Sequence, residues 1–77
     1  MKVDIYKRPE IKGQFSFMAV PEGKAIPEEV TNSDWEIVSR GREFDNPSDL
    51  GDLPIENPRE QIQMKGYAIT SSRDFTK

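Results

Sequence analysis

The sequence predicts an α+β fold: a small sheet of three or four strands, mainly antiparallel, with one or two short helices packed on one face. Two apolar segments near the start alternate with a period of two, as strands do. A segment near the end carries both the start and the stop signals of a helix. The chain has 77 residues, enough for a single domain. We assign that domain to residues 1–71 and expect a flexible tail over residues 72–77.

The first two strands are predicted at residues 2–8 and 14–20, joined by a loop over residues 9–13 in an antiparallel hairpin. Pro9 is expected to end the first strand, because proline has no N–H to give to a strand ladder. The second strand is apolar on both faces, so we expect it to be covered on both sides.

The middle of the chain leaves one choice open. After a turn at residues 21–24, Pro27 and the acids that follow it predict a short helix at residues 27–30. Residues 35–44 are interpreted as a strand, because β-branched and aromatic residues favour strands. An amphipathic helix that starts at Asn32 or Ser33 is the alternative for this segment.

The last part of the chain is predicted as loop, helix and strand. Residues 45–54 show no period and are expected to be a loop. Asn57 is expected to cap a helix that starts at Pro58, with Glu60 completing a capping box, and Gly66 to end it. Residues 67–70 form the last predicted strand. The predicted core is Val3, Ile5, Phe15, Phe17, Ala19, Trp35, Ile37, Ile62 and Ile69.

Composition excludes several classes of function. The chain contains neither cysteine nor histidine, which removes thiol chemistry, zinc sites and the commonest general base. We therefore expect no cofactor, no metal and no enzymatic activity. No apolar run reaches the length of a membrane span, and no signal peptide is recognised, so we expect a cytoplasmic protein without a membrane partner.

An acidic segment runs from Glu43 to Glu60, and we compared it with a calcium-binding loop. Counted from Asp45, the fifth and twelfth positions are acidic, as such loops require. Pro47 stands at the third position and Leu50 at the sixth, where an acid and a glycine are needed. The segment is therefore interpreted as a solvated acidic loop, and whether it binds a cation stays open.

The sequence carries no complete catalytic pattern. Glu28 and Glu29 are adjacent, and neighbouring residues on a helix do not face one point, so they do not form a general acid–base pair. The five glycines stand alone and make no phosphate-binding loop. A carboxylate-based hydrolase is kept only as a remote alternative.

The aromatic residues supply the candidate interaction surface. Tyr6, Arg8, Trp35 and Tyr67 are the residues proposed for it. Trp35 has two interpretations, a core anchor or the centre of an interface. Because Lys2, Lys7, Arg8 and Lys12 crowd the first hairpin, single-stranded RNA binding there is the alternative function. The net charge of −3 opposes binding to phosphate backbones, so nucleic acid is not the expected partner.

The chain also resembles a known family. The segments that carry the resemblance are Val3-Asp4-Ile5-Tyr6-Lys7-Arg8, Phe15-Ser16-Phe17, Ala19-Val20-Pro21-Glu22-Gly23, Ile26-Pro27-Glu28-Glu29, Asp34-Trp35-Glu36 and Lys65-Gly66-Tyr67-Ala68-Ile69-Thr70. This pattern is similar to a family of small uncharacterised proteobacterial proteins, a domain of unknown function. A looser likeness is to the YcgL-type domain, which implies a small α/β sandwich. Neither resemblance implies an activity, a ligand or a catalytic residue.

These observations together predict a non-catalytic protein-interaction or regulatory domain. Its partner is expected to be a protein, whose identity the sequence does not specify. A strand left at the edge of the sheet could pair with its copy in a second chain, so a homodimer is also considered.

Overall fold

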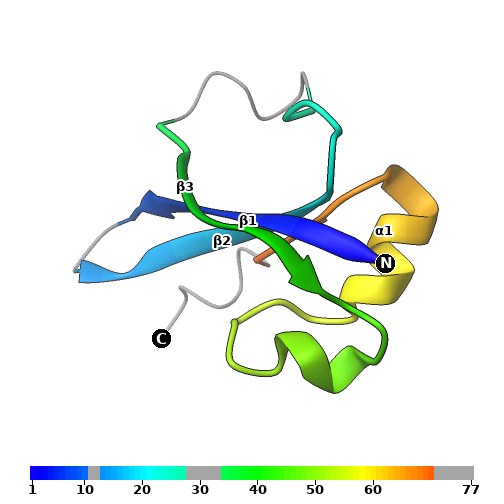
Figure 1. Ribbon diagram of the computed structural model, residues 1–77. Coiled ribbons are helices and arrows are strands. Elements are labelled where there is room, and N and C mark those ends of the chain that lie inside the picture. The colour runs from blue at the N-terminus through cyan, green and yellow to red at the C-terminus, as the bar shows by residue number, and fades with distance from the viewer. Residues whose placement is uncertain (11–12, 28–33, 71–77) are drawn as a thin grey trace.

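The computed structural model describes residues 1–10, 13–27 and 34–70, and these form a four-stranded antiparallel sheet with two helical segments (Figure 1). The spatial order of the strands is β3-β1-β2-β4. The strands are β1 (Lys2–Pro9), β2 (Phe15–Pro21), β3 (Glu36–Glu43) and β4 (Ala68–Ile69). The helical segments are the 3-10 helix η3 (Pro47–Leu50) and the α-helix α1 (Pro58–Lys65). The predicted α+β fold is confirmed. The segment 35–44, for which strand and helix were both considered, forms a strand over Glu36–Glu43.

The β1–β2 hairpin forms the centre of the sheet, and its pairing runs from Val3 opposite Pro21 to Pro9 opposite Phe15. Pro9 is the last residue of β1, so the strand ends at this proline as predicted but includes it, one residue beyond the predicted range 2–8. The hydrogen bond from the Glu10 N–H to the Gln14 carbonyl makes those two residues a hydrogen-bonded pair. Since such pairs alternate along an antiparallel ladder, Pro9 turns its nitrogen away from β2, and no bond of the hairpin is lost.

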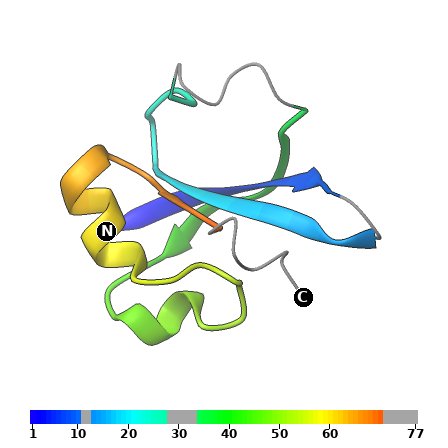
Figure 2. The ribbon, with the colours of Figure 1, turned by 180° about the vertical axis from the view of Figure 1, so that it is seen from behind.

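The main core lies on the face of the sheet that η3 and α1 cover (Figures 1 and 2). Strand residues on this face pack against residues that follow β3, because successive side chains of a strand point to opposite faces. The buried members of this cluster are Val3, Ile5, Ala19, Phe44, Leu50, Ile55 and Ala68, with Phe17, Leu53 and Ile62 partly buried against it. The placement of the helical segments on one face agrees with the prediction.

Four of the predicted core residues lie outside the main core, and one of them, Ile69, is partly buried against a second cluster on the opposite face. Phe15 is 40% exposed, because it sits at the far end of the hairpin, beyond the helical segments. Ile37 is 42% exposed, because β3 is an edge strand and this residue stands on the face opposite the main core. Trp35 is half-buried at the margin of a second cluster on that same face. The predicted core omitted the fully buried Met18 and Leu50.

The segment 45–54, predicted as a plain loop, contains η3 and supplies Leu50 to the core. The Asp49 carboxylate accepts hydrogen bonds from the N–H groups of Asp45 (2.8 Å) and Asn46 (3.0 Å) at the start of η3. Arg42 of β3 donates to the carbonyl of Asp49 at 2.7 Å. The prediction failed because a four-residue helix is too short to show a hydrophobic period, and its start is held by a side chain rather than by a repeat.

Helix α1 spans the residues predicted for it, but its two ends behave differently. Gly66 ends it as expected: φ is 88°, and its N–H donates to the Ile62 carbonyl at 2.8 Å. Asn57 makes no side-chain cap, which corrects the predicted capping box, since its backbone is left-handed with φ at 48°. The last strand is also shorter than predicted. Beyond its end, the Thr70 N–H donates to the Phe17 carbonyl, and the Phe17 N–H donates to the Thr70 hydroxyl.

Two predicted elements lie partly or wholly outside the described residues. The short helix at residues 27–30 is one, and the tail at residues 72–77 is the other. The turn at residues 21–24 is described and is confirmed, since Lys24 N–H donates to the Pro21 carbonyl at 3.0 Å and Gly23 has φ of 86°.

Leu50→Ala is expected to destabilise the domain strongly, because Leu50 is 1% exposed and packs into the main core. The expected loss is about 2–5 kcal/mol of the free energy of unfolding. Urea denaturation followed by circular dichroism would measure it. The matched control is Met64→Ala on α1, where the side chain is 87% exposed and a change within about 0.5 kcal/mol is expected. Equal stability of the two variants would show that η3 does not dock as described.

Candidate interaction surface

The face of the sheet opposite the main core carries a row of apolar side chains that crosses all four strands. Tyr6 of β1 lies opposite Met18 of β2 on one side and opposite Ile37 of β3 on the other. Met18 in turn lies opposite Ile69 of β4. Side chains of directly opposed residues stand on the same face of a sheet. We name Ile37, Tyr6, Met18 and Ile69 the apolar row, and this side of the sheet the aromatic face.

A second hydrophobic cluster is built around the middle of this row. Met18, Val20 and Tyr67 are its buried members. Four partly buried side chains pack against them: Tyr6, Ile26, Trp35 and Ile69. The segment that holds Ile26 leaves the end of β2 and rises on this side of the sheet (Figure 1). The side chains of the row are therefore buried at Met18 and become progressively more exposed toward Ile37 on β3.

Next to the row, Arg8 is held between a carboxylate and an aromatic ring. Its Nε donates to Glu10 Oε2 at 2.8 Å, and a terminal nitrogen lies 2.7 Å from the same oxygen. The guanidinium carbon lies 4.7 Å from the centre of the Trp35 ring. This geometry is that of a cation–π contact. It joins the end of the first hairpin to the residue that precedes β3.

Glu10 Oε2 accepts a third hydrogen bond, from the hydroxyl of the buried Ser16 at 2.6 Å. This bond is the main reason that the pKa of Glu10 lies below its ordinary value, and the Arg8 guanidinium lowers the pKa further. Burial acts in the opposite direction but does not outweigh the two donors. Glu10 is thus a charged anchor that orients Arg8 toward Trp35.

The structure brings together three of the four residues proposed for the interaction surface. Tyr6, Arg8 and Trp35 are half-buried and lie on the aromatic face. Tyr67 is only 4% exposed, because its ring packs against Met18 and Val20, so its predicted place on the surface is corrected.

The sequence reasoning missed Ile37, the exposed end of the apolar row. It treated Ile37 as core because a β-branched residue in an alternating strand usually faces inward. Only the pairing of β3 with β1 shows that Ile37 stands beside Tyr6 at the edge of the sheet.

Asp4 is a buried carboxylate on the same face, and it stabilises an irregular part of β3. Its Oδ1 accepts a hydrogen bond from the Gly41 N–H at 2.9 Å, and Arg40 lies 4.0 Å from its other oxygen. Gly41 has φ of 64°, a conformation that favours glycine. The role of Asp4 that the structure supports is therefore to fix the backbone where the β1–β3 register shifts.

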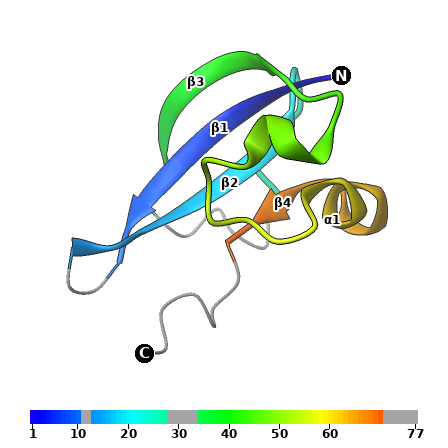
Figure 3. The same cartoon turned by 90° about the horizontal axis from the view of Figure 1, so that it is seen from below.

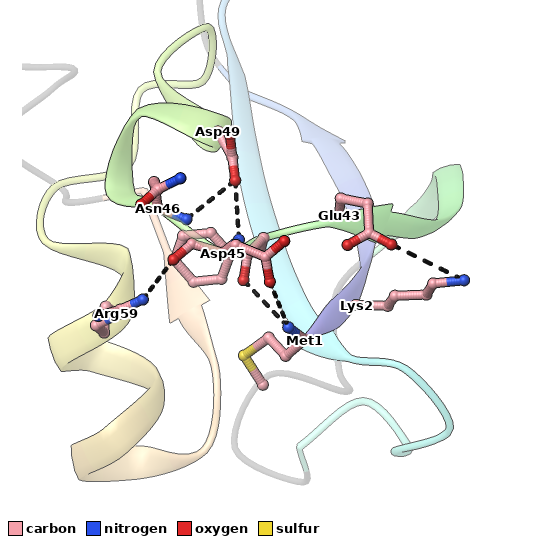
Figure 4. A network of polar contacts seen from close by, with 8 residues as sticks. Met1, Lys2, Glu43, Asp45, Asn46, Asp49 and Arg59 are labelled. Atoms are coloured by element: carbon pink, nitrogen blue, oxygen red, sulfur yellow. Dashed lines mark hydrogen bonds and ion pairs between the residues drawn. The ribbon is translucent and has the colours of Figure 1, made fainter.

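The acids of segment 43–60 face several separate donors (Figure 4). Asp45 lies 3.0 Å from the amino group of Met1, and Glu43 lies 4.0 Å from Lys2. Asp52 binds Arg42, and this ion pair lowers the pKa of Asp52. Within the residues that the structure describes, no three acidic side chains gather closely enough to hold a metal ion. Asp52 thus fastens the residues after η3 to β3, and Glu43 and Asp45 hold the end of β3 and the residues after it against the start of β1.

An open hollow of about 780 Å³ runs along α1 and is bounded by Gln61, Met64 and Ile69 among others.

No helix among residues 1–10, 13–27 and 34–70 has the length and apolar character needed to cross a membrane.

Ser16→Ala is expected to raise the pKa of Glu10 toward its ordinary value of 4.5, because the variant removes the main hydrogen bond to the carboxylate. A carboxylate whose pKa is lowered on folding stabilises the folded state above that ordinary value, and the stabilisation is lost as the pH falls through the folded pKa. Titration of the Glu10 carboxyl carbon by NMR would measure the change. Ser48→Ala, at an exposed serine, is the control, and a Glu10 titration unchanged by Ser16→Ala would contradict the assignment.

Comparison with known proteins adds a family without adding a function. No curated protein and no solved structure matches the chain. The model of a family of unknown function, DUF6139, matches residues 1–76, almost the whole chain. The chain therefore belongs to this family of unknown function, DUF6139.

Proposed function

We propose that this protein is a non-catalytic interaction or regulatory domain that binds a partner protein through the open side of its aromatic face. The observation that carries the proposal is the apolar row, whose β3 end is uncovered. Ile37, which lies opposite the half-buried Tyr6, is 42% exposed, and its neighbour in β3, Val38, is 49% exposed. Apolar and aromatic side chains that are grouped and accessible mark interaction sites more often than scattered ones do.

The residue types at this place fit the centre of a protein interface. Tyrosine, tryptophan and arginine are enriched among the residues that contribute most to binding. Tyr6, Trp35 and Arg8 occupy neighbouring positions on the aromatic face. The contacts of Arg8 with Glu10 and Trp35 order these side chains before a partner arrives. Such ordering lowers the entropy cost of binding.

Two observations support a non-catalytic role. The sequence offers no histidine or cysteine for acid–base or nucleophilic chemistry. Asp4, a buried carboxylate of the described residues, accepts a hydrogen bond from the Gly41 N–H, which gives it a structural role.

We also propose that the protein works in the bacterial cytoplasm. The resemblance to uncharacterised bacterial proteins and the lack of cysteine support this proposal.

Ile37→Ser is expected to weaken partner binding about tenfold or more while the domain stays folded, since the side chain is exposed and truncating an interface anchor costs about 1–2 kcal/mol or more. Affinity capture from a lysate of the native host, with identification of bound protein and RNA, would find the partner. Binding of that partner to purified variants would then be measured by calorimetry.

Met64→Ser is the matched control, because Met64 is an exposed apolar residue on α1, away from the β3 end of the row. Retained binding by this variant and lost binding by Ile37→Ser would support the proposal. Equal binding by both variants would remove the aromatic face as the site.

A second candidate function, single-stranded RNA binding by the first hairpin, is favoured by one observation. Phe15 is exposed rather than buried, and Lys7 Nζ lies 5.0 Å from the centre of its ring. An exposed ring beside a cation can stack a base and contact a phosphate.

Fluorescence anisotropy with mixed single-stranded oligonucleotides tests this candidate. A true site would bind at micromolar protein, gain affinity as salt falls and lose it in Phe15→Ser. No binding at low salt would eliminate it. Because the net charge is −3, we expect that negative result.

A further inference from the structure

A second row of side chains crosses the aromatic face, one step along the strands from the apolar row. Strand β1 lies between β2 and β3 (Figure 3), and its residue Arg8 stands directly opposite Ser16 of β2. On the other side of β1, Lys7 pairs with Glu36, the first residue of β3. The next position brings Arg8 beside Trp35, whose ring centre lies 4.7 Å from the guanidinium carbon. We name Ser16, Arg8 and Trp35 the Arg8 row.

Trp35 lies at the open end of this row, just before β3. It is outside the β1–β3 pairing, which ends at Lys7 opposite Glu36. Inside a strand ladder, the backbone hydrogen bonds and the pleat fix the direction of each side chain. Outside the ladder, the contacts of the side chain itself contribute more to where it lies. Trp35 has such contacts with the second cluster and with Arg8.

Arg8 is in turn held by Glu10 and, through Glu10, by Ser16. Two nitrogens of the guanidinium lie 2.7 and 2.8 Å from Glu10 Oε2. The Ser16 hydroxyl donates to the same oxygen at 2.6 Å. Ser16 is 2% exposed, so its hydroxyl is fixed within the packed centre of the sheet. The donor that anchors the carboxylate is therefore a rigid one.

We propose that Ser16 and Glu10 are positioning residues, which act through Arg8 to hold the Trp35 ring in its place on the aromatic face. Ser16 fixes the carboxylate, the carboxylate fixes two nitrogens of the guanidinium, and the guanidinium lies against the ring. Arginine suits the middle of this chain, because its planar fork can bind a carboxylate while one face of the plane lies on an aromatic ring. A buried serine of β2 thus determines the position of a half-buried ring on the far side of β1.

The consequence for partner binding rests on the function proposed above. A Trp35 ring that is ordered in advance costs less entropy on binding, which is worth a factor of about two to ten in affinity. Ser16→Ala should therefore weaken partner binding, although Ser16 is buried and lies out of reach of a partner. The positioning of Trp35 itself is a property of the free protein and is tested on the purified chain.

A double-mutant cycle on Ser16 and Arg8 tests the proposal, with Trp35 as its readout. Trp35 is the only tryptophan of the chain, so its fluorescence and its indole N–H signal in NMR report on one ring. Ser16→Ala and Glu10→Ala are each expected to shift the indole signal and to increase quenching of the fluorescence by acrylamide. In the Arg8→Ala background, Ser16→Ala should change neither readout, because the link between serine and ring is already broken.

Ser48→Ala, the same substitution at an exposed serine of η3, is the control and should leave both readouts at their wild-type values. Circular dichroism melts establish that each variant is folded. Glu10→Ala keeps the test valid if Ser16→Ala does not fold, since it breaks the same chain at a more exposed residue.

An indole signal that is unmoved in the folded variants would overturn the proposal. So would a Ser16→Ala shift of equal size with and without Arg8, because the serine would then act through the packing of the sheet. These outcomes are independent of partner binding. If the cycle succeeds and Ile37→Ser does not affect binding, the function proposed for the aromatic face fails while the positioning of Trp35 stands.

Discussion

The register of the β1–β2 hairpin is the constraint on which the rest of this structure depends. Because Ile5 lies opposite Ala19 and Tyr6 opposite Met18, each strand sends alternate side chains to the main core and to the aromatic face. A slip by one residue would exchange the two faces. The other strands and the helical segments then add to a sheet whose two sides are already defined.

A chain of 77 residues has little apolar surface to bury, and the domain uses it on both sides of the same two strands. The main core is completed by residues that follow β3, and the second cluster by Tyr67 and by partly buried residues such as Ile26 and Trp35. Polar side chains hold the connecting segments. Asp49 fixes the start of η3, and Asp4 fixes the irregular part of β3. These two carboxylates therefore serve the fold.

The surface features concentrate around β3. One side of this strand continues the apolar row of the aromatic face, and on its outer edge β3 has no strand partner among the described residues. The two properties are separate, since side chains of a strand project above and below the sheet while backbone groups project in its plane. At the β4 edge, by contrast, the side chain of Gln61 bonds to both the N–H and the carbonyl of Ile69.

The sequence by itself determined the strand content of the hairpin, the span of α1 and its end at Gly66, because these depend on short-range period, proline placement and glycine conformation. It also supplied Tyr6, Arg8 and Trp35 as surface candidates. Tertiary structure decided which residues are buried: Phe15 and Ile37 are exposed, whereas Tyr67 and Leu50 are inside. The apolar row and the contrast between the edges likewise arise only when β3 and β4 take their places, because strand order and register depend on contacts between residues far apart in the chain.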